Sequence, residues 1–102
     1  MSEINENATN TKDVIILGSG PAGLTAALYT ARAFLSSLIL TGMSLHGQAG
    51  STDIIENYPG FPNGIGGSEL GLLFQSQAER FGAEVVMDQA ISVDLQKYPF
   101  IV

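Results

Sequence analysis

The chain has 102 residues, is 45% hydrophobic and carries a formal net charge of −6 at pH 7. With only four Lys and Arg residues, it offers no basic patch for nucleic acid or for an anionic membrane surface. It has no cysteine and a single histidine, His46, which excludes thiol chemistry, disulfides and multi-histidine metal sites within these residues. We predict no catalytic residue and no metal site in this chain.

The N-terminal residues 1–12 are polar apart from Ile4, and this composition predicts a disordered tail. No apolar run approaches the length of a membrane span, and the start of the chain lacks the basic and apolar segments of a signal peptide. We therefore expect no membrane contact and a cytoplasmic location. Residues 13–102 have the length of one small domain.

A short apolar strand, expected at residues 13–17, is followed by three glycines with the spacing G-x-G-x-x-G. Gly18 permits a tight turn off the strand, Gly20 lets backbone approach a pyrophosphate, and Gly23 lets the next helix pack closely. That helix starts at Pro21, where free backbone N–H groups are offered to an anion. Strand, glycines and helix together predict a dinucleotide-binding turn.

The next elements extend this turn to a Rossmann-like βαβ unit. The helix is expected at residues 21–34, and residues 38–40 predict a second, parallel strand reached by a right-handed connection. We therefore expect an α/β fold with a parallel sheet. Because two helices cannot cover both faces of such a sheet, we expect the chain to be the opening part of a larger dinucleotide-binding fold. The helical residues predicted to face the sheet are Leu24, Ala27, Leu28 and Ala31.

A long segment, residues 41–67, is rich in glycine but contains regularly placed aliphatic and aromatic residues, which predicts an ordered loop. Ser68 is expected to cap a second helix, with Glu69 in its first turn and Gly82 at its end. Short extended segments are expected at residues 84–87, 90–94 and 100–102.

The end of the second strand bears on which dinucleotide binds. An NAD site usually has Asp or Glu there, to bind a ribose hydroxyl, but Thr41 and Gly42 occupy this place. A threonine hydroxyl binds ribose more weakly because it is neutral. The nearby cation, Arg32, lies in the predicted helix, which weakens the case for a 2′-phosphate pocket. The missing acid counts against a standard NAD site and leaves NADP and FAD open.

Several separated motifs resemble the low-molecular-weight thioredoxin reductases. The glycine motif followed by YTARA at residues 29–33 resembles the start of that family, and TGM at 41–43 with Gly47 and Gln48 is similar to its second flavin segment. The most specific match is IENYPGFP at residues 55–62. Further similarity lies at residues 77–84 and 93–100, so that the resemblance covers about residues 13–102.

The resemblance implies that residues 13–102 are the N-terminal part of an FAD-binding domain. In this family, electrons pass from NADPH to FAD, then to a Cys-x-x-Cys pair, and then to thioredoxin or a similar small redox protein, and the enzyme is a homodimer. By position, residues 41–48 would line the adenosine and pyrophosphate, Asn57 would lie near the flavin, and Ala90 would hold the adenine through its backbone. The cofactor-binding residues implied are Gly18, Ser19, Gly20, Pro21, Ala22, Gly23, Thr41, Gly42, Gly47, Gln48, Asn57 and Ala90.

The chain departs from the family at His46, where the family usually has glycine, and at residues 49–53, where it usually has leucine and threonines. A histidine changes the path of the loop if this position requires a positive φ. With no partner visible in the sequence, we interpret His46 as a solvated loop residue. The Cys-x-x-Cys pair, the second glycine motif and the C-terminal flavin segment of the family are absent. We therefore expect these residues alone to be catalytically incompetent.

The leading hypothesis is the FAD-binding portion of a thioredoxin reductase-like flavoenzyme. One alternative is a ferredoxin or flavodoxin-NADP reductase of the same architecture, which the altered loop around His46 keeps open. Another is a truncated, non-catalytic nucleotide-binding module. We also predict that the chain alone is marginally stable or prone to aggregate, because its strand edges and one sheet face would lack partners.

Overall fold

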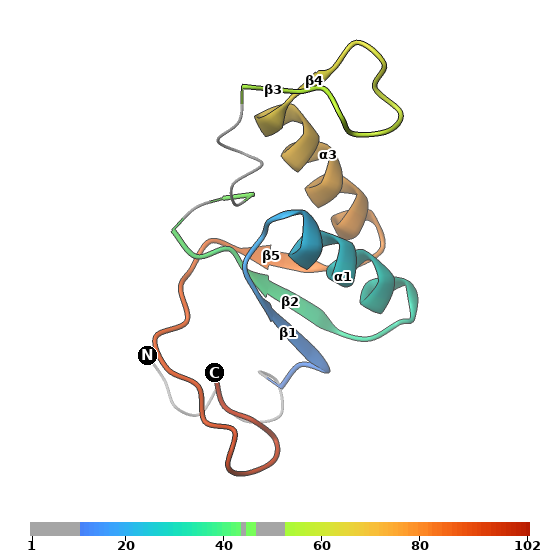
Figure 1. The fold of residues 1–102 in the computed structure, drawn as a ribbon. Coiled ribbons are helices and arrows are strands. Elements are labelled where there is room, and N and C mark those ends of the chain that lie inside the picture. The colour runs from blue at the N-terminus through green and yellow to red at the C-terminus, as the bar shows by residue number, and fades with distance from the viewer. Residues whose placement is uncertain (1–10, 44, 47–52) are drawn as a thin grey trace.

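The structure is a computed structural model that describes residues 11–43, 45–46 and 53–102. Figure 1 shows the helices on one side of the main sheet, with the second helix extending beyond the sheet to a small hairpin at its start. The α/β fold class is confirmed. In chain order the elements are β1 (Val14–Leu17), α1 (Pro21–Arg32), β2 (Ser37–Leu40), β3 (Ile54–Ile55), β4 (Ile65–Gly66), α3 (Gly67–Arg80) and β5 (Glu84–Val86).

The main sheet is parallel, with the strand order β1-β2-β5. Ile16, Ile39 and Val85 lie in register across its three strands, so their side chains share one face. The connections from β1 to β2 and from β2 to β5 each move one strand further across the sheet in the same direction. Because such connections are right-handed, α1 and α3 lie on that same face of the sheet (Figure 1). The small side chains that form the core with this row are Ala27, Ala31, Ala78 and Ala83.

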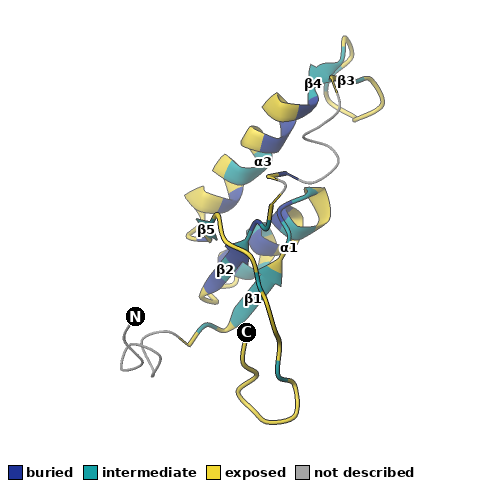
Figure 2. Cartoon of the chain, turned by 90° about the vertical axis from the view of Figure 1, so that its left-hand side faces the viewer, coloured by how far each residue is buried: buried dark blue, intermediate teal, exposed yellow. Residues whose placement is uncertain are grey.

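The face of α1 that meets the sheet was predicted correctly. Leu24, Ala27 and Ala31 are at most 4% exposed, and Leu28 packs against the core while partly exposed. The opposite face of the sheet is less well covered by the described residues, since Leu17 is 53% exposed and Ile15, Leu38 and Leu40 are only partly buried. Figure 2 shows the buried residues concentrated between the helices and the strands.

The end of α1 differs from the prediction. The helix ends at Arg32, and the next residue, Ala33, has a ψ of 8° that no longer continues it. Phe34 adopts a left-handed φ of 66° and is 95% exposed. The helix therefore ends two residues before the predicted end at residue 34, and the chain then turns toward β2.

The start of α3 also differs. The helix begins at Gly67, and its N-cap is the extended Gly66, which has no side chain to form a cap. The prediction that Ser68 is the cap was wrong, because β4 runs directly into the helix and Ser68 already lies in the first turn. Glu69 lies in the first turn as expected, and Gly82 follows the helix with a φ of 109°, which confirms its role as a left-handed stop.

The C-terminal segment forms less regular structure than expected. Residues 84–87 contain β5, but residues 90–94 and 100–102 are not strands. Asp94 and Ile101 instead form an isolated antiparallel bridge, with N···O distances of 2.8 and 3.0 Å. Neither helix in the described part of the chain has both the length and the apolar character needed to cross a membrane.

Candidate dinucleotide site

The last residues of the parallel strands and the residues directly after them are hydrogen-bonded from one strand to the next. The N–H of Gly18 donates to the carbonyl of Leu40 (2.8 Å), and the N–H of Thr41 donates to that of Val86 (3.0 Å). The N–H of Gly42 donates to the carbonyl of Asp88 (2.8 Å). The glycine motif and the segment after β2 therefore meet at the carboxyl edge of the sheet, where open α/β sheets bind ligands.

Residues 18–23, which we call the glycine turn, have the geometry that their spacing predicts. Gly18 adopts a φ of 110°, a conformation that side chains rarely allow. A Cβ added at Gly23 would lie 2.3 Å from the carbonyl oxygen of Gly18, so only glycine lets α1 start this close to the strand. Gly20 is the extended N-cap of α1.

The start of α1 is open to an anion. Within the described part of the chain no side chain caps it, its first turn holds no acidic residue, and Pro21 occupies the first position. The first bond of the helix runs from the N–H of Leu24 to the carbonyl of Gly20 (3.0 Å), so the N–H groups of Ala22 and Gly23 precede this ladder. The helix dipole adds a partial positive charge at this end. This arrangement can bind a phosphate group.

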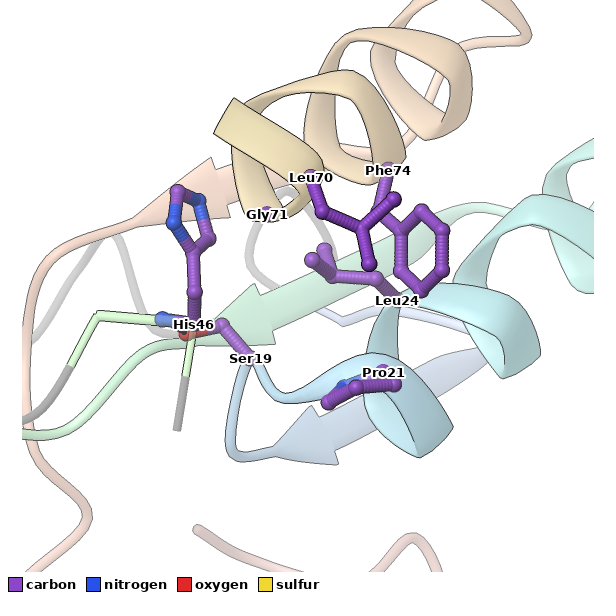
Figure 3. Close-up of a pocket in the computed structure, with 7 residues that line it drawn as sticks. All are labelled: Ser19, Pro21, Leu24, His46, Leu70, Gly71 and Phe74. Atoms are coloured by element: carbon purple, nitrogen blue, oxygen red, sulfur yellow. Dashed lines mark hydrogen bonds between the residues drawn. The ribbon is translucent and has the colours of Figure 1, made fainter. Parts of the chain in front are cut away.

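His46 is buried, which corrects the interpretation of a solvated loop residue. Its side chain is held between the glycine turn and α3, and the residue is only 4% exposed (Figure 3). Its backbone N–H donates to Oγ of Ser19 (2.9 Å), and its Nε2 lies 2.7 Å from Oε1 of Gln75. Its φ is 64°, so the position does have the left-handed backbone that favours the glycine usual in the family.

Gly71 and Gln75 contact His46, and neither residue was predicted from the sequence to lie near the candidate site. A Cβ at Gly71 would lie 2.4 Å from Nδ1 of His46, so this glycine leaves the space that the imidazole fills. The available signal was a glycine inside a helix, which costs about 1 kcal/mol relative to alanine and usually has a packing reason. Nothing in the sequence could pair it with His46, which lies 25 positions earlier.

The other predicted residues are distributed over two regions. Thr41 is buried, and its Oγ1 donates to the carbonyl of Gly42 (3.1 Å). Asn57 is exposed on the β3–β4 connection, away from the glycine turn (Figure 1). Next to it, the ring of Tyr58 packs against that of Phe74 in α3, with centroids 5.5 Å apart, as expected of an ordered loop. Gly47 and Gln48 lie outside the described residues.

Arg32 lies at the far end of α1 from the glycine turn. Its guanidinium carbon is 5.6 Å from the ring centroid of Phe81, over which Arg80 also lies, at 5.1 Å. The guanidinium of Arg32 therefore lies at the junction of α1 and α3 and not at the glycine turn, where a nucleotide phosphate would bind.

Residues 12–102 match the family described as pyridine nucleotide-disulphide oxidoreductase. The chain belongs to this family. The match covers both the glycine turn and the loop that carries Asn57, so the separated motifs form one continuous region of similarity.

Named relatives of this oxidoreductase family confirm the resemblance to thioredoxin reductases. The chain is 51% identical over 88 residues to the thioredoxin reductase of Streptomyces coelicolor, which covers 85% of this chain and 27% of the relative. It is 52% identical over 84 residues to the bifunctional thioredoxin reductase/thioredoxin of Mycobacterium leprae, covering 82% of this chain and 18% of the relative. The solved thioredoxin reductase from Gloeobacter violaceus superposes with a TM-score of 0.80 at 41% identity, over 84% of this chain and 27% of that one. The chain thus spans about a quarter of the length of these reductases.

Proposed function

We propose that this chain is the FAD-binding portion of an NADPH-dependent, thioredoxin reductase-like flavoprotein. The observation that carries the proposal is the glycine turn itself, where contact between Gly18 and Gly23 brings an uncapped helix start to the carboxyl edge of the sheet. A pyrophosphate needs this combination of close backbone approach, free N–H groups and positive dipole. The family match and the thioredoxin reductase relatives support FAD as the dinucleotide.

Each proposed residue contributes binding rather than chemistry. The N–H groups of Gly20, Ala22 and Gly23 would hold the pyrophosphate together with Ser19 and Pro21. Bound FAD would carry electrons between NADPH and a disulfide, whereas this chain contains no cysteine and supplies no thiol. The residues proposed for the adenosine and flavin parts are Thr41, Gly42, Gly47, Gln48, Asn57 and Ala90.

The partners are proposed on the same basis. The names of the relatives support thioredoxin, or a similar small redox protein, as electron acceptor, and the Mycobacterium leprae relative is named as a reductase joined to thioredoxin. We propose a homodimer in the cytoplasm. Dimer assembly and the choice of electron acceptor concern the whole protein. Relatives of this kind are about four times as long as the region that this chain matches.

A ferredoxin or flavodoxin-NADP reductase is the second candidate function. The changed residues around His46 favoured it, because they suggested a differently shaped flavin pocket. In the structure the imidazole fits beside Gly71, and the glycine turn keeps its expected form. In the structure, His46 therefore supports a ferredoxin or flavodoxin-NADP reductase less strongly than the change from glycine to histidine did in the sequence.

The test of the proposed function is a comparison of related ligands. The purified chain is titrated with FAD, FMN and riboflavin, and flavin fluorescence reports binding. FMN lacks the bridging pyrophosphate and riboflavin lacks phosphate altogether. We expect both to bind at least about tenfold more weakly than FAD, which is the effect of losing one charged contact.

Two competitors serve as controls. ADP carries the same pyrophosphate and adenosine and should displace FAD, whereas AMP should displace it poorly. Equal affinity for FAD and riboflavin would show that the glycine turn does not bind phosphate. Tighter binding of NADPH than of FAD would assign the site to a nicotinamide dinucleotide instead.

A further inference from the structure

Four residues from three separate segments form a largely buried contact beside the dinucleotide site. We call Ser19, His46, Gly71 and Gln75 the His46 cluster. Ser19 is 1% exposed and His46 is 4% exposed. Figure 3 shows the backbone of His46 beside Ser19 and its imidazole directed along α3 past Gly71. The cluster therefore joins the glycine turn to α3.

The hydrogen bonds of the cluster have a defined direction. Ser19 Oγ accepts from the backbone N–H of His46 at 2.9 Å. Gln75 uses its amide nitrogen to donate to a carboxylate oxygen of Glu79 (3.3 Å), which leaves its carbonyl oxygen to accept from Nε2–H of His46 at 2.7 Å. The bond to Gln75 therefore places a proton on Nε2 of the imidazole.

Steric fit gives a second, independent observation. A Cβ at Gly71 would lie between 2.4 and 2.7 Å from Nδ1, Cγ and Cβ of His46. The histidine also adopts a φ of 64°, which costs energy for a residue with a side chain and persists only when its surroundings hold it. A strained residue and a space that matches it, on two different elements, indicate a contact with a role rather than chance packing.

We propose that His46 is a positioning residue, which holds Ser19 and thereby fixes the glycine turn in the conformation that binds the flavin pyrophosphate. The inference rests on the proposed function. Ser19 lies between Gly18 and Gly20, and glycine has more backbone freedom than any other residue type. Tethering it to a rigid helix lowers the conformational entropy lost when the ligand is bound. The affinity for FAD, more than the fold, depends on this contact.

The first test removes the acceptor without changing the bulk of the side chain. Gln75→Met deletes the hydrogen bond to His46, and Gln77→Met makes the same chemical change at an exposed position of the same helix. We expect the Kd for FAD to rise about tenfold in Gln75→Met, the effect of one lost hydrogen bond, and to change less than about twofold in Gln77→Met.

A spectroscopic measurement in the absence of flavin tests the contact itself. Nitrogen NMR of the histidine ring should show the Nε2–H tautomer and a slowly exchanging ring proton in the unsubstituted chain and in Gln77→Met. The protected proton should disappear in Gln75→Met. A rapidly exchanging ring or the Nδ1–H tautomer in the unsubstituted chain would overturn the proposal.

The second test is a double-mutant cycle. Gly71→Ala should raise the Kd for FAD about tenfold or more, because its methyl group displaces the imidazole. In a His46→Gly background, the same alanine should change the Kd by less than about twofold, because the space is then empty. An unchanged effect of Gly71→Ala in the two backgrounds would mean that the alanine acts on the helix and not through His46.

The outcomes separate this inference from the proposed function. The flavin function fails if no form of the chain binds FAD. In that case the contact can still be present, shown by a protected ring proton and by a Gly71→Ala effect on the thermal unfolding midpoint that requires His46. The tether then exists but positions no flavin site, and the proposed role is overturned with it. If FAD binds and Gln75→Met leaves its Kd unchanged, the positioning role fails while the flavin function stands.

Discussion

At the scale of single residues, one missing methyl group sets the position of α1. Gly23 lies so close to Gly18 that a Cβ would reach 2.3 Å from its carbonyl oxygen. The obstacle is backbone and not the end of a flexible side chain, so it cannot move aside without opening the turn. The spacing of the N–H groups at the helix start depends on this contact.

Gly23→Ala should therefore weaken FAD binding and stability together. We expect overpacking to lower the free energy of unfolding by about 1–3 kcal/mol, and the displaced helix start to raise the Kd for FAD at least about tenfold. Urea unfolding and flavin titration measure the two effects. Ala26→Ser adds one heavy atom at an exposed position of α1 and should change neither. Wild-type affinity in Gly23→Ala would show that the turn tolerates a wider opening than the structure indicates.

His46 shows why residue roles were only partly predictable. The glycines at residues 18–23 could be interpreted from the sequence alone, because each one meets a requirement of the local backbone. The role of His46 depends on a space in α3 that belongs to residues 25 and 29 positions later. A lone histidine in a glycine-rich segment gives no indication of such a partner, and the solvated interpretation was wrong for that reason.

At the scale of elements, small side chains set how closely the two helices approach the sheet. Ala27 and Ala78 are fully buried, and they lie over the row that contains Ile39. Alanine has high helix propensity and little volume, so the same residues that favour α1 also permit close packing. The hydrophobic periodicity of α1 therefore predicted the face of that helix that is buried.

A larger side chain at this interface should separate the helices. Ala78→Leu inserts three carbon atoms into a packed core and is expected to lower the free energy of unfolding by about 1–3 kcal/mol. Ser76→Leu places the same side chain at an exposed position of α3 and should stay within about 0.5 kcal/mol of the original value. Urea unfolding followed by far-UV circular dichroism compares the two. Equal stability of both variants would mean that the core holds an unfilled space beside Ala78.

At the scale of the whole molecule, the described residues cover one face of the main sheet more fully than the other. The described residues place both helices on the face of Ile39, while Leu17 on the other face is 53% exposed. The C-terminal segment adds further exposed apolar side chains, among them Ile91 at 94% and Leu95 at 63%. Exposed apolar surface of this kind favours association.

We therefore expect the chain without flavin to be of low stability and to self-associate. Its free energy of unfolding should lie below about 5 kcal/mol, the lower end of the usual range for domains. Sedimentation velocity over a range of concentrations should show species larger than the monomer, and saturating FAD should raise the unfolding midpoint by mass action. A monomer with a cooperative, concentration-independent thermal transition would contradict this prediction.

Local patterns in the sequence determined the βαβ unit, the glycine turn and the family, because each of these depends on residues that are neighbours along the chain. The strand order β1-β2-β5, the placement of both helices on one face and the exact ends of the helices were decided by tertiary packing. The burial of His46 was decided in the same way. Its contacts with Ser19 and Gln75 exist only when the chain is folded, since van der Waals fit and hydrogen bonds across 27 and 29 positions leave no periodic pattern in the sequence.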